Sequence, residues 1–249
     1  MTTLKSNFEH DKAALITGAA TGIGAATARQ LAQLGYRVAV CDVNEAAGTA
    51  LAEEIGGRFI QCDVTDFDSV CAAAEVCCST IGVPQFVHLN AGIMTVPTGD
   101  AFLAIEDVSL EQYRRIIGVN LDGVFFGIKS LLPRMRKQGG AITVTASIAA
   151  FGLLPIDPLY CATKHALVGF VRSIAGANTE GNVRLNVICP GVVDTAIVPD
   201  AFRDPTSIMS PEVLANEVVD LLQHGANGEV RAKVTGRDAF EVSPIDVMS

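Results

Sequence analysis

The sequence has no cluster of basic residues and few charged residues of either sign. Its 249 residues include 18 Lys and Arg against 27 Asp and Glu, which gives a formal net charge of −9 at pH 7. Nucleic acids and anionic membranes are bound through clustered Lys and Arg side chains, so neither is expected as a partner. Charged residues make up only 18% of the chain and hydrophobic residues 49%, with a mean hydropathy of +0.37. This composition excludes a disordered chain and supplies a large buried core.

Signals for secretion, membrane insertion and metal binding are also missing. Residues 1–11 read MTTLKSNFEHD, a polar tail without the apolar stretch of a signal peptide. The longest uncharged run, 138–156, contains Gly, Thr, Ser and Pro residues that are typical of a strand and a loop rather than a membrane span. The seven cysteines are odd in number and form no C-x-x-C pair. We therefore expect reduced thiols, no metal and a cytoplasmic protein.

What the sequence does contain is a regular alternation of short apolar runs and helical segments. Strands are expected near 12–17, 36–42, 57–63, 84–90, 141–146, 183–189 and 229–234. Helices are expected to end near 35 and 55, and to cover 66–81, 108–136, the segment from 157 onward, and 210–224. Such alternation is typical of a parallel sheet buried on both faces. We predict an α/β fold in which residues 1–249 form a single Rossmann-type domain, with a doubly wound seven-stranded parallel sheet and helices on both faces.

A glycine-rich loop, TGAATGIGAATARQLAQLG, follows the first strand, with Gly18, Gly22 and Gly24 more widely spaced than in the G-x-G-x-x-G pattern. Gly18 permits a tight turn, Gly22 allows close backbone approach, and Gly24 lets the helix pack on the strand. The amides that open this helix can face a pyrophosphate, which the helix dipole favours. The position between a strand and a helix favours a dinucleotide site over a flexible turn.

Asp42 ends the second strand, 24 residues after Gly18. A carboxylate there can accept both hydroxyls of the adenosine ribose and repels a 2′-phosphate. No Lys or Arg stands at 19–21 or at 43–44 to attract such a phosphate. The expected cofactor is therefore NAD rather than NADP.

Tyr160 and Lys164 stand four residues apart in DPLYCATKHALVGF, so that they face the same side of a helix. A free phenol has a pKa near 10, and a neighbouring ammonium favours the phenolate. Tyr160 can then take a hydroxyl proton as a hydride leaves the carbinol carbon. Ser147, just past the fifth strand, can hydrogen-bond the substrate oxygen.

The ordered set of motifs resembles the short-chain dehydrogenase/reductase family over residues 12 to 234. It consists of Thr17-Gly18-x3-Gly22-Ile23-Gly24, Asn90-Ala91-Gly92, Asn120, Ser147, Tyr160-x3-Lys164 and Pro190-Gly191. The resemblance implies that Lys164 also holds the nicotinamide ribose and that Asn120 supports a proton-relay water. It implies cofactor contacts from Gly18, Thr21, Gly22, Ile23, Gly24, Asp42, Val43, Asp63, Val64, Asn90, Ala91, Gly92, Tyr160, Lys164, Pro190, Gly191, Val193 and Thr195. For Asp63, a helix cap is an open alternative to an adenine contact.

The segments YCATKHALVGFVRS, NVRLNVICPGVVDTAI and FIQCDV further resemble the NAD-dependent 15-hydroxyprostaglandin dehydrogenase-like subgroup, which oxidises a secondary alcohol on a long apolar molecule. Those enzymes carry a glutamine three residues before the tyrosine, where this chain has Asp157. Asp157 can cap the helix or contact the substrate, and its Asp-Pro context favours the cap. The usual asparagine before Asn90 is replaced by Leu89, which His88 precedes.

The residues expected around the substrate are mostly apolar, which predicts a hydrophobic alcohol or ketone. They are Ile93, Met94, Ser147, Leu153, Leu154, Asp157, Val192, Ile197 and Phe202. We thus expect an NAD-dependent dehydrogenase of apolar secondary alcohols that forms a homodimer or homotetramer. The alternatives are an NADPH-dependent ketoreductase and, from another class, a catalytically silent NAD-binding scaffold or sensor. The presence of both Tyr160 and Lys164 weighs against the scaffold.

Overall fold

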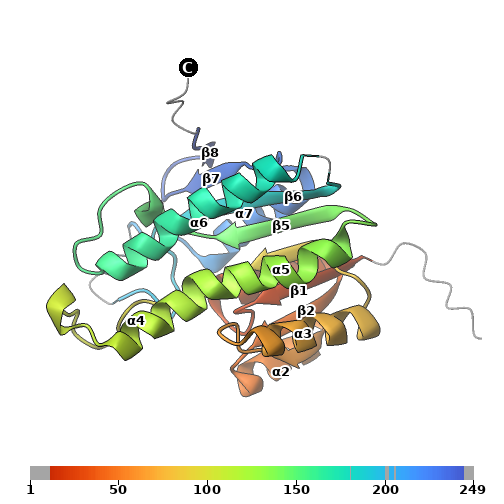
Figure 1. Cartoon of the computed structure of the whole chain (residues 1–249), viewed down its shortest axis with the longest axis horizontal. Coiled ribbons are helices and arrows are strands. Elements are labelled where there is room, and N and C mark those ends of the chain that lie inside the picture. The colour runs from red at the N-terminus through yellow and green to blue at the C-terminus, as the bar shows by residue number, and fades with distance from the viewer. Residues whose placement is uncertain (1–11, 180, 200–201, 205, 244–249) are drawn as a thin grey trace, which may run out of the picture.

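The computed structural model describes residues 12–179, 181–199, 202–204 and 206–243, and the expected polar tail over 1–11 lies outside them. Eight strands form one sheet in the order β3-β2-β1-β4-β5-β6-β7-β8 (Figure 1). All neighbours pair in parallel except β7 and β8. The strands are β1 (Ala13–Thr17), β2 (Arg37–Asp42), β3 (Arg58–Gln61), β4 (Phe86–Leu89), β5 (Gly140–Thr145), β6 (Val183–Pro190), β7 (Val230–Lys233) and β8 (Phe240–Glu241).

Helices cover both faces of this sheet, and each face has its own apolar core. On one face, α1 (Gly22–Gln33), α2 (Glu45–Ile55) and α7 (Pro211–His224) pack against alternate strand residues such as Ile16 and Ile188. On the other face, α3 (Phe67–Thr80), α5 (Gly123–Met135) and α6 (Pro158–Ala177) pack against residues such as Val87 and Val187. Figure 1 shows α5 and α6 lying across the near face of the sheet. Successive strand side chains point to opposite faces, so the apolar runs fill both cores.

The predicted doubly wound α/β sheet is confirmed, with two differences in detail. The sheet has an eighth strand, because the chain turns back after β7 and Phe240 pairs antiparallel with Ala232. The single helix expected over 108–136 consists of α4 (Leu110–Ile117), a π-helical turn (Gly118–Asp122) and α5. A π turn inserts an extra residue and often marks a functional position, and here it contains Asn120.

This run, Leu110–Met135, is also long and apolar enough to cross a membrane by length and composition. Half of its apolar window is buried inside the protein. Its buried residues include Val124, Ile128 and Leu131, which belong to the core beneath α5. The helix therefore has the composition of a core helix that covers a sheet.

The strand order indicates which edge of the sheet is expected to bind a ligand. The strand order reverses between β1 and β4, which both end at the same edge. In open α/β sheets, ligands bind in the crevice at the carboxyl ends of the strands, next to such a reversal.

Candidate active site

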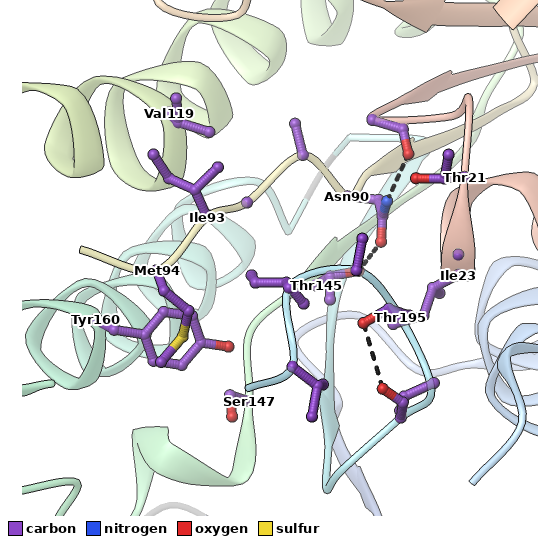
Figure 2. A pocket seen from close by; sticks show the side chains of 18 of the residues that line it. Thr21, Ile23, Asn90, Ile93, Met94, Val119, Thr145, Ser147, Tyr160 and Thr195 are labelled. Atoms are coloured by element: carbon purple, nitrogen blue, oxygen red, sulfur yellow. Dashed lines mark hydrogen bonds between the residues drawn. The ribbon is translucent and has the colours of Figure 1, made fainter. Parts of the chain in front are cut away.

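A cavity of about 620 Å³ opens at the carboxyl ends of the parallel strands. Its walls come from the glycine loop after β1, the ends of β2 and β4, the segment after β5, the start of α6 and the turn after β6. Figure 2 shows residues of these separate elements, among them Ile23, Asn90, Ser147 and Tyr160, gathered around one space. The fold therefore brings together most of the residues that the sequence motifs singled out.

The glycine loop has the close backbone contacts that its sequence predicts. Gly18 has φ +60°, and a Cβ there would lie 2.7 Å from the Cα of Ala91. Gly22 has φ +55°, and its Cβ would lie 2.8 Å from Cγ2 of Thr195. A Cβ on Gly24 would lie 2.2 Å from the carbonyl oxygen of Gly18, and Gly24 does not line the cavity. Gly24 therefore serves the packing of α1 against the loop, while Gly18 and Gly22 leave backbone open to a ligand.

Two carboxylates lie at the end of the cavity formed by β2 and the segment after β3. One oxygen of Asp42 accepts the amide of Ala20 and the other accepts the amide of Asn44, each at 2.9 Å. These bonds hold the carboxylate at the rim while its remaining lone pairs can accept ligand hydroxyls. Asp63 also lines the cavity, and its Oδ1 accepts both the amide and the hydroxyl of Thr65. The cap of α3 is Asp66 rather than Asp63.

Asn90 ties β4 to β1 at the reversal of the strand order. Its Nδ2 donates to the carbonyl of Gly18 at 3.0 Å, and its amide donates to Oγ1 of Thr17 at 3.1 Å. Asn90 thus fixes the start of the glycine loop, and Gly22 and Ile23 at the start of α1 line the cavity. Together with the contacts that a Cβ on Gly18 or Gly22 would make, this arrangement fits the pyrophosphate of a dinucleotide.

Tyr160 and Lys164 lie one turn apart on α6, and both line the cavity. Asp157 caps this helix by accepting the amide of Tyr160 at 2.9 Å, and Pro158 occupies its first turn. Lys164 is 2% exposed, and its ammonium donates to the carbonyl oxygen of Thr145 at 2.9 Å. Its Nζ lies 5.4 Å from the centroid of the Tyr160 ring. Figure 2 shows Tyr160 reaching into the cavity with Ser147 nearby.

Burial dominates the acid–base properties of this pair. It raises the pKa of Tyr160 to about 12, although a hydrogen bond with the Ser147 side chain lowers it. Burial also lowers the pKa of Lys164 to about 8. The low polarity around both groups disfavours their charged forms. The expected lowering of the tyrosine pKa by the lysine ammonium stays a prediction. In this environment the neutral phenol of Tyr160 is favoured over the phenolate.

Asn120 does not line the cavity, and its side chain is fully engaged. Its Oδ1 accepts the amide of Ile93 at 2.8 Å, and its Nδ2 donates to the carbonyl of Ile93 and to Oγ1 of Thr163. The asparagine thus connects the π turn to the segment after β4 and to α6. This geometry positions the cavity wall, and the expected support of a relay water stays a prediction.

The structure places only part of the expected substrate wall at the cavity. Ile93, Met94, Ser147 and Ile197 line it. Leu153 is 90% exposed, and Asp157 turns its carboxylate inward to Thr95 and Tyr160. The residues that lie outside the cavity wall are Leu153, Leu154, Asp157, Val192 and Phe202. None of these five residues lines the described cavity, and their contact with a substrate stays a prediction.

Several cavity residues were missed by the sequence interpretation. Most of them adjoin a recognised motif in the sequence: they follow Asn90-Ala91-Gly92 or Thr195, or precede Asp63, Asn120 or Ser147, whereas Arg115 stands apart on α4. Their position next to these motifs in the sequence is the signal that could have identified them. They are Cys62, Val96, Pro97, Thr98, Arg115, Val119, Thr145, Ala146, Ala196 and Val198.

The residues expected to contact a cofactor line the cavity, with the exception of Gly24. They are Gly18, Thr21, Gly22, Ile23, Asp42, Val43, Asp63, Val64, Asn90, Ala91, Gly92, Tyr160, Lys164, Pro190, Gly191, Val193 and Thr195. All seven cysteines are free thiols. Within the part of the chain that the structure describes, no group of three or more His, Cys, Asp or Glu residues could hold a metal ion.

Comparisons with known proteins agree with this geometry. A family model described as short chain dehydrogenase matches residues 12–206. The chain is 34% identical over 243 residues to cyclohexanol dehydrogenase from Acinetobacter sp. (strain SE19), covering 91% of this chain and 94% of that protein. It is 32% identical over 253 residues to 15-hydroxyprostaglandin dehydrogenase (NAD+) from Homo sapiens, covering 90% of this chain and 91% of that protein.

Comparison with solved structures also finds a short-chain reductase. The 3-ketoacyl-(acyl-carrier-protein) reductase from Brucella melitensis, complexed with NADH, matches with a TM-score of 0.81 and 29% identity. The match covers 89% of this chain and 95% of that one. These similarities confirm the resemblance that the ordered motifs indicate.

Proposed function

Because the chain belongs to the short-chain dehydrogenase/reductase family, we propose that this oxidoreductase transfers a hydride between NAD and an apolar secondary alcohol or ketone. The observation that carries the proposal is the convergence of Ser147, Tyr160 and Lys164 on the cavity that the glycine loop also lines. A tyrosine acid, a serine donor and a lysine beside a dinucleotide cradle are the groups that such a transfer requires.

Tyr160 carries the proton in this mechanism. NAD, when bound, accepts the hydride that leaves the carbinol carbon. As the C–H bond breaks, the hydroxyl proton passes to the deprotonated Oη of Tyr160, and the C–O bond becomes a carbonyl. Ser147 donates a hydrogen bond to the substrate oxygen in either direction. In the reverse reaction Tyr160, held as a phenol by its raised pKa, returns the proton to the carbonyl oxygen.

Asp42 supports NAD over NADP. Its carboxylate lines the cavity and is fixed by the amides of Ala20 and Asn44. A 2′-phosphate on the adenosine ribose would meet this negative charge at close range. The runner-up, an NADPH-dependent ketoreductase, requires a cation at this position, and residues 19–21 and 43–44 contain none.

An apolar substrate is favoured by the wall near Tyr160. Ile93, Met94, Val96, Val119, Ile197 and Val198 supply aliphatic side chains to the cavity wall. Pockets of this kind bind apolar groups and use a few polar atoms to fix orientation. The similarity to a cyclohexanol dehydrogenase is consistent with such a substrate. We further propose that the protein is cytoplasmic and works as a homodimer or homotetramer.

The test is the formation of NADH from a panel of cyclic alcohols, hydroxy fatty acids, aryl alcohols and short polyols, repeated with NADP. We expect turnover of apolar secondary alcohols with NAD. Activity on polyols or sugars alone would overturn the apolar substrate, and a preference for NADP would overturn the role of Asp42. NAD binding without turnover of any alcohol or ketone would instead favour a silent scaffold or sensor.

A further inference from the structure

A row of polar side chains crosses the apolar face of the sheet that α1 and α7 cover. His88 on β4 pairs in register with Thr143 on β5, which pairs with Asn186 on β6. All three side chains are fully buried. Each has one atom without a hydrogen-bond partner in the described part of the chain: Nδ1 of His88, Oγ1 of Thr143 and Oδ1 of Asn186. Buried polar atoms are rarely left unpaired, so three on adjacent strands at one level require a common explanation.

The bonds at the cavity end of this row fix the tautomer of His88. Nδ2 of Asn90 donates to Gly18, so Oδ1 of Asn90 is an acceptor. The Thr145 hydroxyl donates its proton to that oxygen at 3.2 Å, as the dashed line in Figure 2 marks. Nε2 of His88 lies 2.8 Å from the same hydroxyl oxygen, which has no second proton to donate. Nε2 must therefore carry the proton, and Nδ1 is an acceptor.

The three unpaired atoms then divide into two acceptors and one donor. Nδ1 of His88 accepts, and so does Oδ1 of Asn186, since its Nδ2 donates to the carbonyl of Leu221 on α7 at 3.3 Å. The Thr143 hydroxyl supplies a donor. A water molecule can donate one proton to each of the two acceptors and accept the proton of the Thr143 hydroxyl. One water therefore satisfies all three atoms.

We propose that one internal water joins His88, Thr143 and Asn186, and that His88, held by it as the Nε2–H tautomer, is a positioning residue for the cofactor site. His88 does not line the cavity, and it acts through Thr145. Burial keeps the imidazole neutral, since it lowers the pKa of His88 to about 3.

Thr145 is the point at which this row meets the site. Its carbonyl accepts the ammonium of Lys164, and its hydroxyl orients Asn90, which holds the glycine loop at Gly18. A rotation of the Thr145 side chain therefore removes the support of Asn90, and a shift of its backbone moves the acceptor of Lys164. This positioning role rests on the proposed function, whereas the water and the tautomer do not.

The tautomer is tested by ¹⁵N NMR of the imidazole nitrogens in the full chain, with the His88 signals assigned by their loss in His88→Gln. We expect a protonated Nε2 and an unprotonated Nδ1 near neutral pH. A protonated Nδ1 overturns the assignment.

A crystal structure tests the water. We expect one water within hydrogen-bonding distance of Nδ1 of His88, Oγ1 of Thr143 and Oδ1 of Asn186. Direct contact between any two of these atoms, or an empty site, contradicts the proposal.

The positioning role is tested by the dissociation constant for NAD in His88→Met and His88→Gln. Glutamine keeps an N–H donor for Thr145, whereas methionine of similar length has none. Loss of one hydrogen bond predicts NAD binding weaker by about threefold to tenfold in His88→Met, with His88→Gln nearer to the parent protein. Equal binding in all three overturns the role.

Because His88 is buried, the His88→Met variant could misfold, and a second pair of variants at Thr145 tests the same positioning role. Thr145→Val removes the hydroxyl that links His88 to Asn90, and Thr145→Ser keeps it. The same ordering of NAD affinities is expected, with serine the tighter binder, and the reverse ordering contradicts the role. If the parent protein does not bind NAD, the proposed function fails, and the NMR and crystallographic results still decide the water and the tautomer.

Discussion

The carboxylate of Asp157 accepts two hydrogen bonds from Thr95, at 2.8 Å from the amide and 2.5 Å from the hydroxyl. It also accepts the amide of Tyr160, so that one side chain joins the start of α6 to the segment after β4. Both segments line the cavity, and Asp157 itself is 2% exposed. Of the two roles that the sequence left open, the structure has the helix cap, with the Thr95 contacts added to it.

Replacing Asp157 by Ala is expected to lower the free energy of unfolding by about 2–4 kcal/mol, since it removes a helix cap and leaves two buried donors of Thr95 unpaired. Asp157→Asn, which keeps one acceptor oxygen, is expected to lose less. Denaturant unfolding of both variants measures this. If the alanine variant is as stable as the parent protein, the carboxylate is not the connector that its contacts indicate.

Gly22→Ala places a Cβ 2.8 Å from Thr195 at a left-handed φ of +55°. We expect a loss of stability of roughly 1–2 kcal/mol from the backbone alone, together with weaker NAD binding. Gly35→Ala is the matched control, since it has φ +83° and no atom within 4 Å of the added Cβ. Calorimetric titration with NAD should separate the two variants. Equal NAD affinities would show that the loop does not cradle the cofactor.

Asp42→Ala is expected to shift the ratio of kcat/KM for NADP to that for NAD upward by at least about tenfold, because juxtaposed like charges cost several kcal/mol. Asp42→Asn, which keeps acceptor oxygen for Ala20 or Asn44 without the charge, should show much of the same shift. Initial rates with each cofactor measure the ratio. An unchanged ratio in both variants would mean that Asp42 does not select the cofactor.

The raised pKa of Tyr160, about 12, predicts how the two directions of the reaction respond to pH. Below that pKa, the phenolate fraction grows about tenfold per pH unit, so the rate of alcohol oxidation should rise with pH from 6 to 8. Ketone reduction uses the phenol, which stays protonated over that range, and should change little. Oxidation that slows between pH 6 and 8 would contradict Tyr160 as the base.

Most of the fold and the proposed reacting groups could be predicted from the sequence, because each of them corresponds to a local pattern of residues. Apolar runs located seven parallel strands, and glycine, Asp42, Ser147, Tyr160 and Lys164 lie at the cavity as expected. Side-chain direction in the irregular segments leaves no such pattern, so the exposure of Leu153 could not be predicted. The pKa of Tyr160 also could not be read from spacing, since burial is the largest cause of its shift.

The surroundings of His88 are another feature that the sequence alone could not predict. In the sequence it is one histidine in a strand, and nothing local indicates that Thr143 and Asn186 lie beside it. Only the strand order β4-β5-β6 and its register bring the three together. Contacts between strands far apart in the chain are set by topology, which a sequence pattern does not contain.

The most direct test of the account is Tyr160→Phe, measured for both NAD binding and turnover of the best alcohol found for the parent protein. Phenylalanine keeps the ring and removes only the Oη that carries the proton. We predict that turnover falls by about a hundredfold or more, while the dissociation constant for NAD stays within about twofold of the parent value. Turnover close to that of the parent protein would contradict Tyr160 as the general acid and base.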